Sequence, residues 1–264
     1  IRLGGPVRTL IITALLSATV GTIAAAQDFN WHGAIARGKR LEVKGVNGDV
    51  RAVLASGAEA VVNAAKHSRR SDPDEVEIKV VEHEDGITIC AVYPTPPRAR
   101  RENSCEPGDR WHSSTENNDV TVDFEVQVPA GVVFNGQTVN GEMSAEGLKA
   151  DVKASTVNGS VRVTTTGLAE ASTVNGSVYV EMGRADWSDE IEFTTVNGKI
   201  TLVMPERVNT EVRASTVNGE IESDYPLMIT GKFGPRRVRG TIGSGGRSLS
   251  LNTVNGEIRL RKSP

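Results

Sequence analysis

The sequence has few aromatic residues, which make up 4% of its 264 positions. Proteins that bind single-stranded nucleic acid by stacking need several exposed rings, and this chain has only 3 Trp, 3 Tyr and 5 Phe. Its formal net charge of −3 also argues against a basic surface for polyanions. We therefore expect no nucleic-acid partner.

Residues and motifs typical of enzymes are scarce. The four histidines share no metal-ligand spacing; they are His32, His67, His83 and His112. The sequence lacks G-x-S-x-G, H-E-x-x-H and P-loop motifs. The carboxylate cluster Asp72-Pro73-Asp74-Glu75 is more typical of a solvated turn than of an acid/base pair, and residues 115–123 lack a proper calcium-loop signature. We predict no catalytic residue, no metal site and no cofactor.

Long apolar runs are absent except at the start of the chain. In residues 1–26, Arg2 and Arg8 precede a short apolar run that ends in an A-x-A pattern at Ala24 and Ala26. This pattern predicts a signal peptide cleaved after Ala26, and an uncleaved membrane anchor is the alternative. Cleavage would remove two arginines and make the net charge two units more negative. We expect an exported protein of the periplasm or cell surface, with no transmembrane span after cleavage.

The sequence has only two cysteines, Cys90 and Cys105. They flank a segment rich in proline and arginine that has no strand pattern. In an oxidising compartment such a pair tends to join, and the bond would stabilise the fold by about 3 kcal/mol on loop-entropy grounds. The alternative is a redox or metal pair, but there is no C-x-x-C, and His112 alone makes a poor zinc set. We predict a structural disulfide.

Arginine is concentrated in two places. One cluster lies between the cysteines, at Arg98, Arg100 and Arg101, and its role stays open. The other lies near the C-terminus, at Arg236, Arg237 and Arg239, with Arg259, Arg261 and Lys262 after it. We interpret both as solvated regions, with contact to anionic envelope polymers or lipid headgroups as the alternative.

One hexapeptide, T-V-N-G-x-[VI], recurs along the chain. Six copies begin at Thr138, Thr156, Thr173, Thr195, Thr216 and Thr253, the first ending in Met, and a shorter copy covers residues 46–50. This is an internal repeat, and we predict that its asparagines form structural turns: Asn47, Asn140, Asn158, Asn175, Asn197, Asn218 and Asn255. From Asn140 the spacings are 18, 17, 22, 21 and 37 residues. The last is near two periods, which predicts a decayed copy between Asn218 and Asn255.

Apolar and polar residues alternate on both sides of each Asn-Gly, which indicates strands with one buried face. Asn-Gly supplies the positive φ angles that a reversal or corner needs. We predict an all-β fold, a β-solenoid in which the Asn-Gly turns stack at one corner. Stacking explains why the turn sequence is nearly identical in every repeat, because each asparagine side chain can then hydrogen-bond to the next, as in an amide ladder. A meander of hairpins is the alternative.

The first part of the mature chain also has β patterns, and we divide the protein into three parts. These are the signal peptide at 1–26, an N-terminal β region with the disulfide-bounded loop at 27–128, and a repeat region at 129–264 that continues it. Strand patterns occupy residues 41–53, 75–82, 86–93 and 120–128, while residues 58–66 are ambiguous. Trp31 is expected to cover the blunt N-terminal end of the solenoid.

The repeats resemble a bacterial domain-of-unknown-function family of β-strand repeat proteins, often labelled putative adhesins. The resemblance covers roughly Trp31 to Leu260. Three other segments are also similar to the family: LEVKGVNGDV (Leu41–Val50), ITICAVYP (Ile87–Pro94) and VPAGV (Val128–Val132). The resemblance implies an exported, right-handed β-helix-like protein of the bacterial envelope and supplies no catalytic residues. We therefore expect a non-enzymatic structural or binding role, with an envelope glycan or protein as partner. A polysaccharide-active β-helix enzyme and an envelope-stress sensor are the alternatives.

Overall fold

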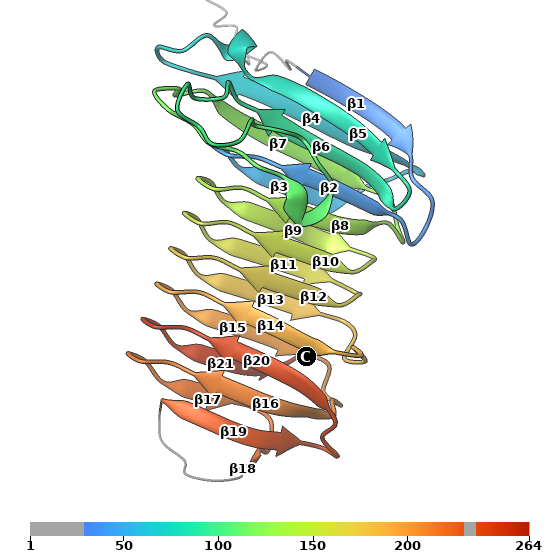
Figure 1. Cartoon of the computed structure of the whole chain (residues 1–264). Helices are drawn as coiled ribbons and strands as arrows, with labels where there is room; N and C mark the ends of the chain where they lie inside the picture. Colours follow the sequence, from blue (N-terminus) through green and yellow to red (C-terminus); the bar gives the residue numbers. More distant parts are fainter. Residues whose placement is uncertain (1–28, 230–235, 264) are drawn as a thin grey trace, which may run out of the picture.

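The computed structural model describes residues 29–229 and 236–263. They form two long sheets packed face to face into a rod (Figure 1). The expectation of an all-β fold is confirmed, since the only helices in the described part are two single 3-10 turns, Pro73–Glu75 and Gly108–Arg110. The predicted signal peptide, residues 1–26, lies outside the described residues.

Sheet A has ten strands in the described part of the chain. In spatial order they are β1 (Phe29–Ala34), β4 (Glu59–His67), β7 (Thr121–Val128), β3 (Val50–Leu54), β9 (Met143–Leu148), β11 (Val161–Thr165), β13 (Val178–Met182), β15 (Ile200–Met204), β21 (Ile258–Lys262) and β17 (Ile221–Ser223).

Sheet B has eleven strands over the same ranges. In spatial order they are β18 (Met228–Ile229), β19 (Arg237–Ile242), β16 (Thr210–Ser215), β20 (Arg247–Asn252), β14 (Glu190–Thr194), β12 (Ala169–Ser172), β10 (Val152–Ser155), β8 (Val133–Gln137), β2 (Arg40–Lys44), β6 (Gly86–Val92) and β5 (Glu77–His83).

Each repeat forms one coil, made of a strand of sheet B, an Asn-Gly turn and a strand of sheet A. Neighbouring coils pair in parallel, as Val152 with Ala169 in sheet B and Val161 with Val178 in sheet A. A meander would pair its strands antiparallel, so the parallel register excludes the meander for the repeat region. The winding is that of a flattened solenoid, and its right hand stays a prediction.

The core lies between the two sheets and follows the alternating pattern. In β11 and β13 the inward residues Val161, Val163, Val178 and Val180 are buried, while the residues between them face outward. Burying one such side chain stabilises the fold by about 1.5–3 kcal/mol, and every coil buries several of them. The core is thus continuous along the rod, and each coil depends on its neighbours to complete it.

The spatial order of the coils departs from the sequence order at the C-terminal end. The last coil, β20–β21, lies between the coils β14–β15 and β16–β17. The prediction of a decayed copy between Asn218 and Asn255 is therefore wrong. The intervening chain instead contributes β18 and β19, which pair antiparallel at the end of sheet B, and the chain then turns back to fill the place beside β14.

The N-terminal end has a similar arrangement. The coil β6–β7 lies outside the earlier coil β2–β3, pairing in parallel with both of its strands. Antiparallel strands then cover it: β5 on sheet B, and β4 followed by β1 on sheet A. The ambiguous segment 58–66 is thus part of a capping strand. Trp31, in β1, packs partly buried against the core at this end, as expected.

Candidate functional site

The asparagine side chains of the turns are hydrogen-bonded in series along one edge of the rod. The Nδ2 of Asn158 donates to Oδ1 of Asn140 at 2.7 Å, and Asn175 donates to Asn158 in the same way at 2.8 Å. We call the whole series the asparagine ladder. In spatial order it runs Asn47, Asn140, Asn158, Asn175, Asn197, Asn255 and Asn218.

The threonine of each repeat adds a second bond between the same coils. Its side chain is buried, and its Oγ1 donates to the carbonyl of the turn glycine in the adjacent coil. Thr173, for example, donates to the oxygen of Gly159 at 2.8 Å. All six copies make this bond at 2.8–3.0 Å. A buried hydroxyl needs such a partner, so threonine at this position is explained.

The glycine is required by close packing between coils. A Cβ built on Gly198 would lie 1.9 Å from the carbonyl oxygen of Gly176, and the other repeats are equally tight. The prediction that Asn-Gly supplies positive φ angles is wrong for the asparagines and holds for only three of the seven repeat glycines, Gly48, Gly159 and Gly176. Among the described residues the only non-glycine with positive φ is Asn117, which lies outside the repeats.

The two cysteines are joined. Cys90 lies in β6, and its Sγ is bonded to that of Cys105 with the Cα atoms 5.6 Å apart. The segment between them leaves the solenoid, and the chain that follows Cys105 folds back over the outer face of β2. There it covers Glu42 and Lys44, whose side chains are 2% and 4% exposed.

A buried ion pair holds this loop in place. Glu42 accepts hydrogen bonds from the Gly108 N–H at 3.0 Å and the Thr88 hydroxyl at 2.8 Å, while Lys44 donates to the carbonyls of Glu106 and Gly108. Burial alone would raise the pKa of Glu42. The bonds from Gly108 and Thr88, the charge of Lys44 at 3.4 Å and the Asn135 amide outweigh it and lower that pKa.

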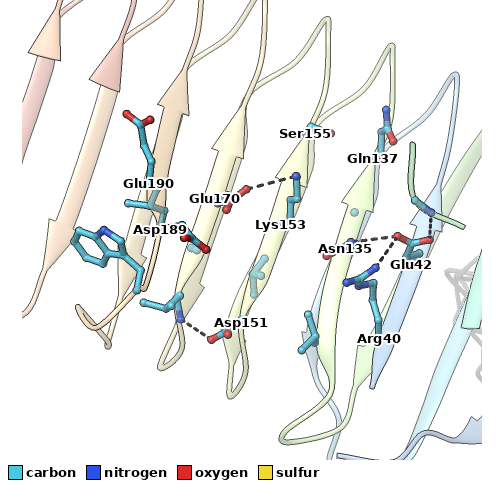
Figure 2. A pocket seen from close by; sticks show the side chains of 18 of the residues that line it. Arg40, Glu42, Asn135, Gln137, Asp151, Lys153, Ser155, Glu170, Asp189 and Glu190 are labelled. Carbon is cyan, nitrogen blue, oxygen red and sulfur yellow. Dashed lines mark hydrogen bonds and ion pairs between the residues drawn. The ribbon is translucent and has the colours of Figure 1, made fainter. Parts of the chain in front are cut away.

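A groove of about 450 Å³ begins at this ion pair and crosses the outer face of sheet B (Figure 2). Glu42, Asn135, Lys153 and Glu170 form a row across β2, β8, β10 and β12 because these strands pair in parallel register. Neighbouring strands lie about 4.8 Å apart, so the row presents a polar group at that interval. Trp187, at the far end, is buried and donates from Nε1 to the Ser248 carbonyl.

The groove offers charges of both signs. Lys153 and Glu170 form an ion pair at 3.5 Å, with both side chains about half exposed. At the other end Arg40 lies 3.7 Å from Glu42. The Nε of Arg40 is buried, and among the described residues it has no hydrogen-bond partner. A buried donor without a partner costs free energy, while the Arg40 side chain as a whole is 39% exposed and lines this end of the groove.

The other sequence candidates do not join the groove. The cluster at 72–75 forms a 3-10 turn in which Asp72 Oδ1 accepts from the Asp74 N–H at 3.0 Å. In the part of the chain that is described, no three His, Cys, Asp or Glu side chains gather as a metal site. Sequence reasoning missed Arg40, Glu42, Lys153, Glu170 and Trp187. The outward positions of the first four in alternating strands could have indicated them, whereas Trp187 is buried in the loop before β14 and has no such signal.

The family model described as Toastrack DUF4097 matches residues 111–261. The chain belongs to this family. The Toastrack match begins at Trp111, before β7, and ends within β21, so it covers all six full repeats and both coils whose order is exchanged at the C-terminal end. It agrees with the resemblance stated from the T-V-N-G repeats.

Two solved structures resemble this Toastrack protein over most of the chain. A putative cell adhesion protein from Clostridium sporogenes is 11% identical, with a TM-score of 0.44, and covers 89% of this chain and 99% of its own. A putative adhesin from Bacteroides fragilis is 10% identical, with a TM-score of 0.31, and covers 88% and 96%. No curated protein matches the chain. Among the described residues no helix is long and apolar enough to span a membrane.

Proposed function

We propose that this Toastrack protein is an exported, non-enzymatic, adhesin-like component of the bacterial envelope. Its sheet B groove would bind a glycan chain there. The row formed by Asn135, Lys153 and Glu170 supports this role most directly, because it presents donors, acceptors and both charges at a regular interval. A linear glycan has hydroxyls along its whole length and can follow such a row.

The ends of the groove suit the same ligand. The guanidinium of Arg40 lines the groove and is 39% exposed, so it can donate to a sugar hydroxyl or carboxylate. Such polar groups fix the orientation of a bound ligand and supply specificity. The asparagine ladder has a structural part in this proposal: its turns, stacked at one corner, keep the strands in the register that builds the row.

Glycan binding is tested with the purified protein on a glycan array, followed by titration of each ligand found. The variant Lys153→Ser/Glu170→Ser removes one ion pair from the groove without changing the net charge. Its matched control is Arg162→Ser/Glu146→Ser, which removes a pair of similar exposure and length, 3.7 Å, from sheet A. We expect the groove variant to weaken binding about tenfold or more, and the control to bind as the wild type does.

Equal losses in the two variants would place the ligand elsewhere. Cleavage of a bound polysaccharide would contradict the non-enzymatic role and indicate a polysaccharide-active β-helix enzyme instead. Export is tested separately, by the mass of the protein recovered from the periplasm or medium. We expect a chain that begins at Gln27, and recovery of the intact chain from the cytoplasm would contradict the proposal.

A further inference from the structure

Three arginines share the outer face of sheet B at the C-terminal end of the rod. Arg213 in β16 and Arg239 in β19 are direct cross-strand partners in the antiparallel pair. Arg237 lies two residues before Arg239 on the same exposed face, since Val238 between them is buried. We call Arg213, Arg237 and Arg239 the arginine face.

This placement is unfavourable for the protein alone. Directly opposed residues of an antiparallel pair have Cβ atoms about 5 Å apart, and like charges there are destabilising. Arg213 has one long ion pair, 3.9 Å to Glu190, and both of these side chains are half exposed. Across residues 29–229 and 236–263, neither Arg237 nor Arg239 makes an ion pair or a side-chain hydrogen bond.

The opposite sheet at the same end is different. Arg259 and Arg261, in β21, make four ion pairs of 2.6–3.5 Å with Glu222, Asp224 and Glu257. At this end the two arginines of sheet A are therefore neutralised, whereas on sheet B Arg237 and Arg239 have no ion pair within the described residues. The arginine face has the charge that an anionic partner would complement.

An apolar side chain lies on the same face. Met228 in β18 is 66% exposed and pairs with Thr241 of β19, which is an outward position like Arg237 and Arg239. Arginines beside an exposed apolar side chain are typical of surfaces that meet anionic lipid headgroups and the first acyl carbons. A soluble polyanion would bind the arginines but would gain nothing from contact with the apolar side chain of Met228.

We propose that the arginine face and Met228 form a docking surface for a bilayer that contains anionic phospholipids. β18 and β19 lie at the end of the rod (Figure 1), so the tip can touch a membrane while the rod stands away from it. Glu170 lies farther along the outer face of sheet B. Its repulsion from the headgroups favours this tilt, which keeps the groove, on the same face of sheet B, at a distance from the membrane.

The test measures binding of the whole protein to vesicles of phosphatidylcholine with and without phosphatidylglycerol. The measured quantity is the ratio of the two dissociation constants. Residues 1–26 are the same in every variant, so differences between variants do not come from them. The wild type should prefer anionic vesicles, and the preference should fall as salt is raised. Equal binding to neutral vesicles, or a preference that salt does not change, would overturn the proposal.

The decisive variant is Arg213→Ser/Arg237→Ser/Arg239→Ser. Each arginine near an anionic surface contributes about fivefold in affinity, so the three together should cost roughly a hundredfold. The control is Arg98→Ser/Arg100→Ser/Arg101→Ser, which makes the same change in net charge on exposed residues of the loop between the cysteines. It should bind within about twofold of the wild type, and an equal loss there refutes a specific surface.

The same variants also test whether the protein still folds and whether the ligand is a membrane or a soluble polyanion. Removing opposed like charges should leave the unfolding midpoint of the first variant unchanged or higher. If that variant fails to fold, Arg237→Ser/Arg239→Ser gives the same test with a loss of about thirtyfold. Met228→Ser should weaken vesicle binding a few-fold and leave any binding of soluble polyphosphate unchanged. Polyphosphate that binds as tightly as the vesicles would show that the partner is not a membrane.

Discussion

Asn175→Ala tests whether the asparagine ladder acts as a connected series. Asn175 lies inside the ladder and makes two amide bonds, donating to Asn158 and accepting from Asn197, both at 2.8 Å. The same substitution at Asn218, the last member, breaks one bond of 2.7 Å to Asn255. Both side chains are exposed, so each bond contributes toward the lower end of the usual range, about 0.5–1 kcal/mol. We expect a loss of about 1–2 kcal/mol for Asn175→Ala and about half of that for Asn218→Ala.

Urea unfolding of the two variants and the wild type measures this difference. Asn218→Ala is the matched control, because residue type, motif and exposure are the same and only the number of bonds differs. Losses of equal size would refute the reasoning, since independent turns give no dependence on position. Asn175→Asp adds a check on direction. Its carboxylate can accept from Asn197 but cannot donate to Asn158, so its folded-state pKa should be raised, and the stability lost at neutral pH should return in acid.

Three more predictions follow from the contacts between coils and under the loop. Gly198→Ala should cost about 2–4 kcal/mol because its Cβ would clash with the Gly176 carbonyl, whereas Gly57→Ala, with no atom within 4 Å, should be nearly neutral in the same urea assay. Cys105→Ser should lower stability by about 3 kcal/mol, and thermal unfolding with reductant should affect the wild type but not the variant. Glu42 has a lowered folded-state pKa, so its contribution is present above the ordinary carboxyl pKa and is lost as pH falls through the lowered value. Glu42→Gln should remove this acid-sensitive part, and an unchanged profile of urea midpoint against pH would contradict it.

The strands could be predicted from the sequence because their pattern is local. Predicted strands at 86–93 and 120–128 correspond closely to β6 and β7. Alternation of buried and exposed residues repeats every two residues and needs no knowledge of partners. The disulfide was also predictable, because the protein has only two cysteines and one pairing is possible. The role of the repeat glycine was not, since contact between coils is needed to see that a Cβ has no room.

The order of the coils could not be predicted in the same way. Each repeat presents the same threonine, asparagine and glycine, so Asn197 can bond to Asn218 or to Asn255 with identical chemistry. The chain between those two repeats decides the matter. It forms β19, which pairs antiparallel along β16. With that side of β16 occupied, the last coil has its place on the other side, next to β14.

The groove was beyond sequence reasoning for a related reason. Its row joins Glu42 to Asn135, which are 93 residues apart, through the exchange of coils at the N-terminal end. The burial of Glu42 also depends on a loop that arrives from residues 106–108. Outward positions are predictable from alternation, but their neighbours depend on the stacking order.

The exchanged order at both ends has one physical cause. A stack of parallel coils leaves an open strand edge at each end, which is a template for pairing with another chain. Both ends of sheet B, and the N-terminal end of sheet A, are covered by antiparallel strands: β5 at one end, β19 and β18 at the other, and β4 with β1 on sheet A. On sheet A the last strand is β17, only three residues long, and short edges pair poorly. Capping strands must lie outside the coils, so the coils nearest the two termini, β2–β3 and β20–β21, lie inside. The repeats therefore provide the contacts by which coils stack, and the segments without repeats determine the order of the coils in the stack.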